Sequence, residues 1–293
     1  IQRSGPSTGM PTRTQQGDLI GAAYASHGDT KHPLLFPATP KECFDFATVA
    51  LDLADRVQTP VLVMSDLELG MNDNLSEPLE WDDAARYDRG KVLDAEQLEQ
   101  REVFGRYLDV DGDGIGYRTL PGTHPEKGAF FTRGTSRDEF AAYTESPEAY
   151  ERNTKRLELK WQTIRSLVPK AEVASQGQRI GVLFYGTTAL PMPEAVDLLQ
   201  GDGIALDSCR VRAFPFGAEV ESFVQDHEIV FVVEQNRDAQ MRTLLINELQ
   251  TDPAKLVPVL YYAGLSISAD TIYQQISDYF TENKLSRLAE VQS

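Results

Sequence analysis

Residues 2–19 combine side chains that could hold a small anion. The segment "QRSGPSTGMPTRTQQGDL" places Arg3 and several serine and threonine hydroxyls among glycines and prolines. A guanidinium offers paired N–H donors that match a carboxylate, and glycine and proline at this density predict a rigid loop. The pattern therefore predicts a loop whose hydroxyls and N–H groups converge on one anion, with an ordinary surface turn as the alternative.

Residues 107–122, "YLDVDGDGIGYRTLPG", resemble the start of a calcium loop. Alternating aspartates closed by Gly114 are typical of such loops, but the twelfth position, which needs a bidentate glutamate, is Leu120. We expect a structural Ca²⁺ or Mg²⁺ here, completed by water or by another carboxylate such as Glu126. The alternative is a turn whose aspartates bond their own backbone. The expected ligands are Asp109, Asp111, Asp113 and the Ile115 carbonyl.

Two further clusters could contribute to a site. "SHGDTKHP" carries His27 and His32, which can change charge near neutral pH. His27 could contact a substrate, or it could only cap its own loop with hydrogen bonds. For His32 we favour the second role. Glu234, Gln235 and Asn236 stand at the carboxyl end of an expected parallel strand, where open α/β sheets place binding groups. These three residues could bind a ligand or form an interface.

The elements that would position these residues alternate between helix and strand. Residues 39–58 have helical apolar spacing, and 59–70 read as a buried strand. Residues 71–140 interrupt this rhythm and predict a long irregular excursion. Residues 148–168 predict an amphipathic helix, and 169–178 a linker.

The second half predicts a compact β-α-β-α domain with a parallel sheet. It contains neither GxGxxG after a strand nor GxxxxGK[ST], so nucleotide-phosphate binding has no local support. The expected strands lie at 179–188, 206–214, 228–236 and 256–264, and the expected helices at 193–203, 218–227, 237–249 and 268–283.

Composition limits the function further. The 28 basic and 45 acidic residues give a formal charge of -17, which disfavours nucleic acid as a partner. No apolar run is long enough to span a membrane and no signal peptide is evident, so we expect a cytoplasmic protein. Cys43 and Cys209 lack metal-type spacing and read as small core residues. Because the chain starts at Ile1 with a turn, we expect preceding sequence upstream or in another chain.

Several segments in fixed order resemble the α subunit of 2-oxoacid:ferredoxin oxidoreductases, most closely the 2-oxoglutarate branch. The resemblance extends over nearly the whole chain. It rests on "QRSGPSTGMPTRTQQGDL", "SHGDTKHP", "TPVLVMSDLELGMN", "YLDVDGDGIGYRTLPGTHP", "KGAFFTRGTS" and "EQNRDAQMRTLL".

This resemblance implies an α/β fold in two parts. Residues 1–170 would be the C-terminal part of a pyrimidine-type thiamine-diphosphate-binding domain with a metal-loop excursion, and 179–293 a transketolase-C-terminal-like parallel α/β domain. It also implies a hetero-oligomer whose β chain holds the cofactor diphosphate, its Mg²⁺ and a [4Fe-4S] cluster. Coenzyme A would accept the acyl group and ferredoxin the electrons. A γ-type domain would be a separate chain.

By motif position, Arg3 matches the arginine that binds the substrate carboxylate, and Thr12 matches a nearby pocket threonine. If His27 faces the same pocket, it could contact the substrate or its distal carboxylate. The glutamate that protonates the aminopyrimidine and a Tyr-Pro-Ile-Thr-Pro segment lie upstream of residue 1 in such proteins, so this chain would complete a site without activating the cofactor. The expected activity is oxidative decarboxylation of a 2-oxoacid. The alternatives are an acidic calcium-binding interaction module and a thiamine-diphosphate decarboxylase subunit without redox chemistry.

Overall fold

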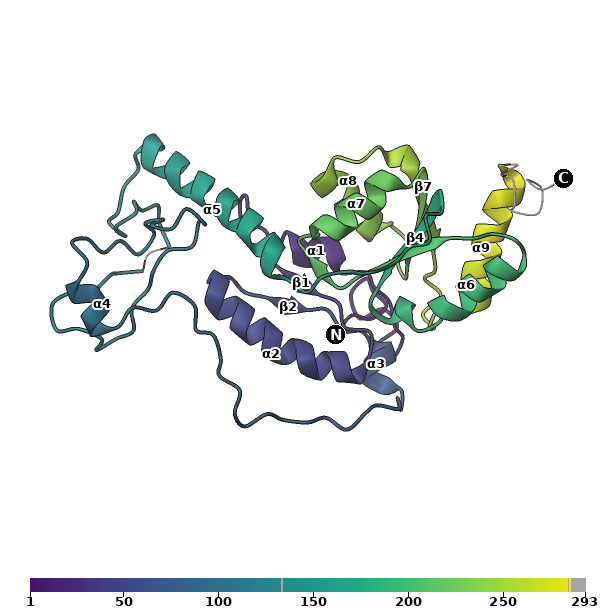
Figure 1. Cartoon of the computed structure of the whole chain (residues 1–293), viewed down its shortest axis with the longest axis horizontal. Helices are drawn as coiled ribbons and strands as arrows, with labels where there is room; N and C mark the ends of the chain where they lie inside the picture. Colours follow the sequence, from purple (N-terminus) through teal and green to yellow (C-terminus); the bar gives the residue numbers. More distant parts are fainter. Residues whose placement is uncertain (133, 284, 286–293) are drawn as a thin grey trace. The chain divides into compact units, whose positions relative to one another are not determined.

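The computed structural model describes residues 1–132, 134–283 and 285 of the chain (Figure 1). These residues form two compact units that interleave along the sequence. The first unit comprises residues 1–48, 61–81 and the chain from Val168 onward, and the second comprises Val49–Pro60 and Asp82–Leu167.

A five-stranded sheet organises the first unit. Its strand order is β3-β5-β4-β7-β8, and β5, β4, β7 and β8 run parallel while β3 pairs antiparallel with β5. This edge strand β3 is three exposed residues long, and the opposite edge strand β8 contains Pro258. The strands are β3 (Glu172–Ala174), β4 (Ile180–Tyr185), β5 (Asp207–Val211), β7 (Ile229–Glu234) and β8 (Leu256–Leu260).

Helices cover both faces of this sheet because its central strands are apolar on both sides. On one face, Val182 and Phe231 pack in a core with α6 (Met192–Gly201) and α9 (Ala269–Glu282). The other face belongs to α7 (Ala218–Asp226) and α8 (Gln240–Leu249), seen beside β7 in Figure 1. A Cβ added at Gly181 would lie 2.6 Å from the Phe223 ring, so α7 approaches β4 closely.

A smaller sheet lies in the same unit. Strand β1 (Leu34–Leu35) pairs parallel with β2 (Leu62–Val63) and antiparallel with β6 (Ala213–Phe214). Residues from both halves of the sequence therefore share one sheet. The helices that accompany it are α1 (Leu19–Ala23), α2 (Pro40–Val57) and α3 (Leu67–Met71), and two short 3₁₀ helices lie at Gly186–Ala189 and Pro253–Lys255.

The second unit is mostly irregular. Between residues 82 and 146 the described chain has one helix, α4 (Ala95–Glu99), and it then enters the long helix α5 (Pro147–Leu167). The predicted excursion and the helix after it are thus observed. No helix among the described residues is both long and apolar enough to cross a membrane.

Three expected elements differ from the structure. The strand expected at 206–214 is divided between β5 in the larger sheet and β6 in the smaller one. The strand expected over 59–70 is only β2, because Asp66 accepts the N–H groups of Glu68 and Leu69 and starts α3 there. The expected linker at 169–178 contains β3, whose three residues are too short to carry a strand pattern. The domain boundaries proposed from the sequence stay predictions.

Candidate functional site

The amino-terminal loop is closed by its own backbone. The Ser4 N–H donates to the Arg13 carbonyl at 2.8 Å, and the Met10 N–H donates to the Ser4 carbonyl at 3.1 Å. The buried Ser4 hydroxyl also donates to the Thr14 carbonyl at 3.0 Å. These bonds join the start and the end of the loop and hold residues 5–12 as a protruding turn.

Gly9 is required by this turn. It has a φ of +49°, and a Cβ there would lie 2.0 Å from the Ser4 carbonyl oxygen. A side chain at this position would therefore break the closure. The rigidity that the sequence predicted for the segment has a specific cause in this contact.

The loop presents Arg3 and Thr12 to solvent. Their chain neighbours Ser4 and Arg13 are joined by the closing hydrogen bond, so both residues lie at the base of one loop. No ion pair or hydrogen bond engages the Arg3 side chain among the described residues, which leaves its guanidinium available to a ligand. His27 is exposed in a separate turn after α1, and no described hydrogen bond links it to the other two. Their common role in one pocket stays a prediction.

The end of the loop segment docks on the carboxyl edge of the five-stranded sheet. The Gln16 N–H donates to the Gln235 carbonyl at 2.7 Å, and the Gln16 side-chain oxygen accepts the Gln235 N–H at 3.1 Å. Asn236 Nδ2 donates to the Gln16 carbonyl at 3.1 Å. We call the buried polar residues here the sheet-edge cluster: Gln16, Thr187, Thr188, Glu234, Gln235 and Asn236.

Glu234 is the member of this cluster that binds the start of α8. Its buried carboxylate accepts the N–H groups of Met241 at 2.8 Å and Arg242 at 3.1 Å at the start of α8, and Asn236 Nδ2 at 2.6 Å. Burial raises the pKa of Glu234, although these hydrogen bonds oppose the rise. Glu234, the last residue of β7, and the two residues that follow it therefore make contacts within the chain.

Asp66 and its neighbour Ser65 connect the base of the amino-terminal loop to the sheet-edge cluster. Thr187 Oγ1 donates to Asp66 Oδ2 at 2.5 Å, and Gln235 Nε2 donates to Thr187 at 3.2 Å. The Gln2 N–H donates to the Ser65 carbonyl at 2.7 Å. Arg3 therefore follows a residue whose backbone is held by a hydrogen bond. Burial raises the pKa of Asp66 above its ordinary value.

The aspartate loop contains a cation of its own. Lys91 Nζ lies 2.7 Å from Asp111 Oδ2, 2.7 Å from Asp113 Oδ1 and 3.0 Å from the Ile115 carbonyl oxygen. Burial opposes the charge of Lys91, but the two carboxylates outweigh it and raise its pKa, while the pKa of Asp111 is lowered by Lys91. The ammonium thus contacts three of the four expected metal ligands.

Asp109, the remaining expected ligand, bonds its own loop. Its carboxylate accepts the N–H groups of Gly112, Asp113 and Gly114 at 3.0 to 3.2 Å. Within the described residues no group of three or more histidine, cysteine or acidic side chains is placed to hold a metal ion. A metal at this loop stays a prediction, and it would have to displace Lys91.

Sequence reasoning missed several residues that organise these regions. Lys91 precedes the aspartate loop by eighteen residues or more and carries no motif. Gln16 was noted only as part of the loop. Their contacts join segments far apart in sequence, such as Gln16 with Gln235, and only the fold reveals them.

Comparison with known proteins places the first 113 residues in one family, described as "Pyruvate flavodoxin/ferredoxin oxidoreductase, thiamine diP-bdg". This match concerns that segment, which is less than half of the chain.

Two relatives are similar to a larger part of the chain. The chain is 33% identical over 251 residues to "2-oxoacid:ferredoxin oxidoreductase 2, subunit alpha" of Aeropyrum pernix, covering 83% of this chain and 38% of that protein. It is 30% identical over 243 residues to "2-oxoglutarate synthase subunit KorA" of Methanothermobacter thermautotrophicus, covering 80% of this chain and 61% of that subunit. The predicted relationship to these α subunits is confirmed.

A solved structure agrees with the fold. The 2-oxoglutarate:ferredoxin oxidoreductase of Magnetococcus marinus, solved with 2-oxoglutarate, coenzyme A and succinyl-CoA bound, matches 95% of this chain and 47% of its own with a TM-score of 0.80 and 23% identity. This match supports the predicted α/β architecture. The chain spans less than two thirds of the length of each of these three proteins.

Proposed function

We propose that this chain is part of the α subunit of a thiamine-diphosphate-dependent enzyme that oxidatively decarboxylates a 2-oxoacid, 2-oxoglutarate in the first instance. The acyl group would pass to coenzyme A and the electrons to ferredoxin. The observation that carries the proposal is the similarity to an α subunit of this activity along 83% of the chain. A calcium-binding interaction module has no comparable support.

The amino-terminal loop fits a carboxylate ligand better than a metal-bound diphosphate. It offers the Arg3 guanidinium, which has no partner within the described part of the chain, and the Thr12 hydroxyl, and the loop closure at Ser4 holds both in place. Two parallel N–H donors on a rigid base fix the orientation of a carboxylate as well as its position. In this role Arg3 orients the carboxylate that leaves as CO₂, and Thr12 donates to the same ligand.

Thiamine diphosphate, when bound, supplies the stabilised carbanion chemistry that decarboxylation needs. We propose that a β chain holds its diphosphate and Mg²⁺ together with an iron-sulfur cluster, and that a separate chain or segment supplies the family's amino-terminal part. This chain's own contribution is to bind and orient the substrate.

The proposal is tested by reconstitution. The 293-residue chain, mixed with thiamine diphosphate, Mg²⁺, 2-oxoglutarate, coenzyme A and ferredoxin, is expected to show no turnover. Addition of the β chain and the amino-terminal part is expected to produce coenzyme-A-dependent ferredoxin reduction. Turnover by the isolated chain would overturn the subunit assignment. Release of CO₂ by the assembly without ferredoxin reduction would instead favour the decarboxylase.

A further inference from the structure

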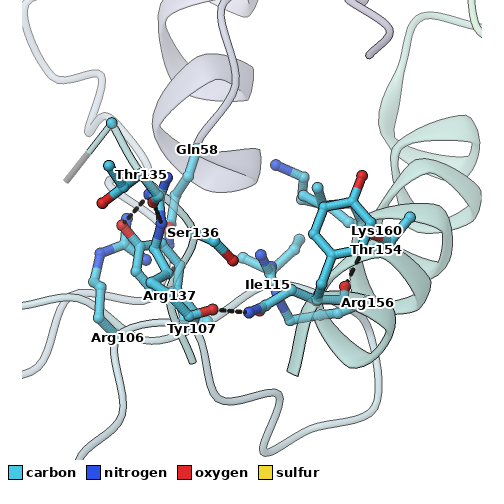
Figure 2. A pocket seen from close by; sticks show the side chains of 15 residues that line it. Gln58, Arg106, Tyr107, Ile115, Thr135, Ser136, Arg137, Thr154, Arg156 and Lys160 are labelled. Atoms are coloured by element: carbon cyan, nitrogen blue, oxygen red, sulfur yellow. Dashed lines mark hydrogen bonds between the residues drawn. The ribbon is translucent and has the colours of Figure 1, made fainter. Parts of the chain in front are cut away.

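A cavity of about 450 Å³ lies within the second unit. Figure 2 shows its walls, which come from the segments around residues 106 and 135 and from one side of α5. Four basic side chains line it: Arg106, Arg137, Arg156 and Lys160. We call these four residues and the space between them the cationic pocket.

None of the four cations has an ion-pair partner among the described residues, although the chain carries an excess of acidic residues. Other basic residues of the same unit do pair: Arg56 with Asp88, Arg118 with Asp55, and Lys155 with Glu151. The pocket therefore concentrates positive charge that forms no ion pair among the described residues.

The cations stand close enough to disfavour one another. Burial, together with the charges of Arg156 and Arg106, lowers the pKa of Lys160 to about 8. Burial and then Arg106 also lower the pKa of Arg156. The buried Nε of Arg156 has no hydrogen-bond partner among the described residues. A site with these properties gains by binding negative charge.

Neighbouring groups hold the guanidinium groups in place without neutralising them. Arg106, Arg137 and Arg156 lie 5.1, 5.1 and 5.8 Å from the centre of the Tyr107 ring. Arg137 Nη1 donates to the Tyr107 hydroxyl at 3.1 Å, a bond drawn in Figure 2. Arg156 Nη1 donates to the Gly114 carbonyl at 2.7 Å. Their remaining N–H groups are thereby pre-positioned for a ligand.

We propose that the cationic pocket binds the phosphate groups of a phosphorylated small molecule. A phosphate carries close to two negative charges at neutral pH and several strong acceptor oxygens, so one group can meet more than one guanidinium. A carboxylate has a single charge and two oxygens and would leave most of the pocket unpaired. The volume is in the range of small-molecule sites and admits a diphosphate. The hydroxyls of Thr135 and Ser136 at the wall are further donors.

Calorimetric titration of the full 293-residue chain with inorganic pyrophosphate tests the proposal. We expect saturable binding with one site per chain. Arg106→Gln is the main variant, because no described hydrogen bond depends on that guanidinium, and Lys160→Gln is the second. Each is expected to weaken binding by roughly tenfold or more, since a charge-assisted contact is lost.

Lys155→Gln is the matched control. Lys155 lies on the same helix, is 71% exposed and pairs with Glu151 outside the pocket, so it should change the dissociation constant by less than about twofold. The proposal is overturned if the wild-type chain does not bind pyrophosphate. It is equally overturned if Arg106→Gln and Lys160→Gln bind as tightly as Lys155→Gln.

Competition identifies the source of the phosphate. Coenzyme A is compared with coenzyme A that lacks the 3′-phosphate. Stronger displacement of pyrophosphate by the complete molecule would assign the pocket to a cofactor of the proposed reaction. Retention of pyrophosphate in the presence of coenzyme A would assign it to another phosphorylated molecule. The pyrophosphate titration needs no turnover, so its failure is distinct from failure of the proposed function.

Discussion

The sheet-edge cluster and the cationic pocket are both rich in polar side chains, but they differ in where their partners lie. In the cluster, Gln16, Glu234 and Asn236 bond one another or nearby backbone. Of the cluster's side-chain oxygens and nitrogens, Gln235 Oε1 alone has no hydrogen-bond partner within the described residues. In the pocket, four cations share no acidic partner among the described residues. Polar groups satisfied inside the chain support folding, whereas groups left over are available to a ligand. Removing a member should therefore have opposite consequences in the two regions.

The largest effect is expected at Glu234. Glu234→Ala leaves the N–H groups of Met241 and Arg242 without their acceptor in a buried site, and we expect the free energy of unfolding to fall by about 3 kcal/mol or more. Urea unfolding measures this. Glu228→Ala removes an exposed glutamate paired with Arg179 and should cost less than about 1 kcal/mol. Equal losses for the two variants would contradict the cluster's structural role.

A smaller effect, confined to catalysis, is expected at Arg3. In the proposed assembled enzyme, Arg3→Ala should lower kcat/KM for 2-oxoglutarate by roughly ten- to a hundredfold, because the proposed charge-assisted contact to the substrate would be lost. Arg3→Lys should recover part of this, since an ammonium keeps the charge but not the fork. Arg13→Ala, on the same exposed loop, is the control and should stay within about twofold. Near-normal kinetics of Arg3→Ala would remove Arg3 from the site.

Lys91 combines features of both regions, because it is a cation that the chain does neutralise. Lys91→Met should lower the free energy of unfolding by roughly 1 to 2 kcal/mol, as Asp111 and Asp113 lose their partner in a partly exposed site. Calcium and Lys91 compete for the same oxygens, so calcium should raise the melting temperature of Lys91→Met more than that of the wild type. Equal responses to calcium would show that the ammonium does not occupy the predicted metal position.

The smallest effect is a pH dependence from Lys160. Its pKa is about 8 in the folded chain and 10.5 as the ordinary value, so between these pH values the unfolded chain binds more protons and stability rises with pH. We expect a gain of about 1 kcal/mol from pH 7 to 10 after allowance for solvent screening. Lys160→Met should remove this rise and be more stable than the wild type at pH 7. A pH profile that the substitution leaves unchanged would contradict the assignment.

Elements with long apolar patterns could be predicted from the sequence. The helix expected at 39–58 is observed as α2, and the strand expected at 228–236 is observed as β7, because periodicity and burial agree over many residues. β3 could not be predicted, since three exposed residues carry no pattern and depend on pairing with β5.

The candidate functional residues also differ in whether they could be predicted from the sequence. Arg3 and its rigid loop followed from residue types within a short segment. The cationic pocket did not, because Arg106, Arg137 and Lys160 are spread over more than fifty positions and only the folding of the excursion onto α5 brings them to one cavity.

The two edges of the five-stranded sheet have a consequence for producing parts of this protein. Open sheet edges promote association between copies, and short length, charge and proline all suppress it. Here Glu172 on β3 pairs with Arg210 on β5, and Pro258 withholds an N–H on β8. A fragment beginning at residue 179 would lose β3 and uncover the full length of β5. Fragments intended for study of this half should therefore begin before Glu172, or they will be prone to aggregate.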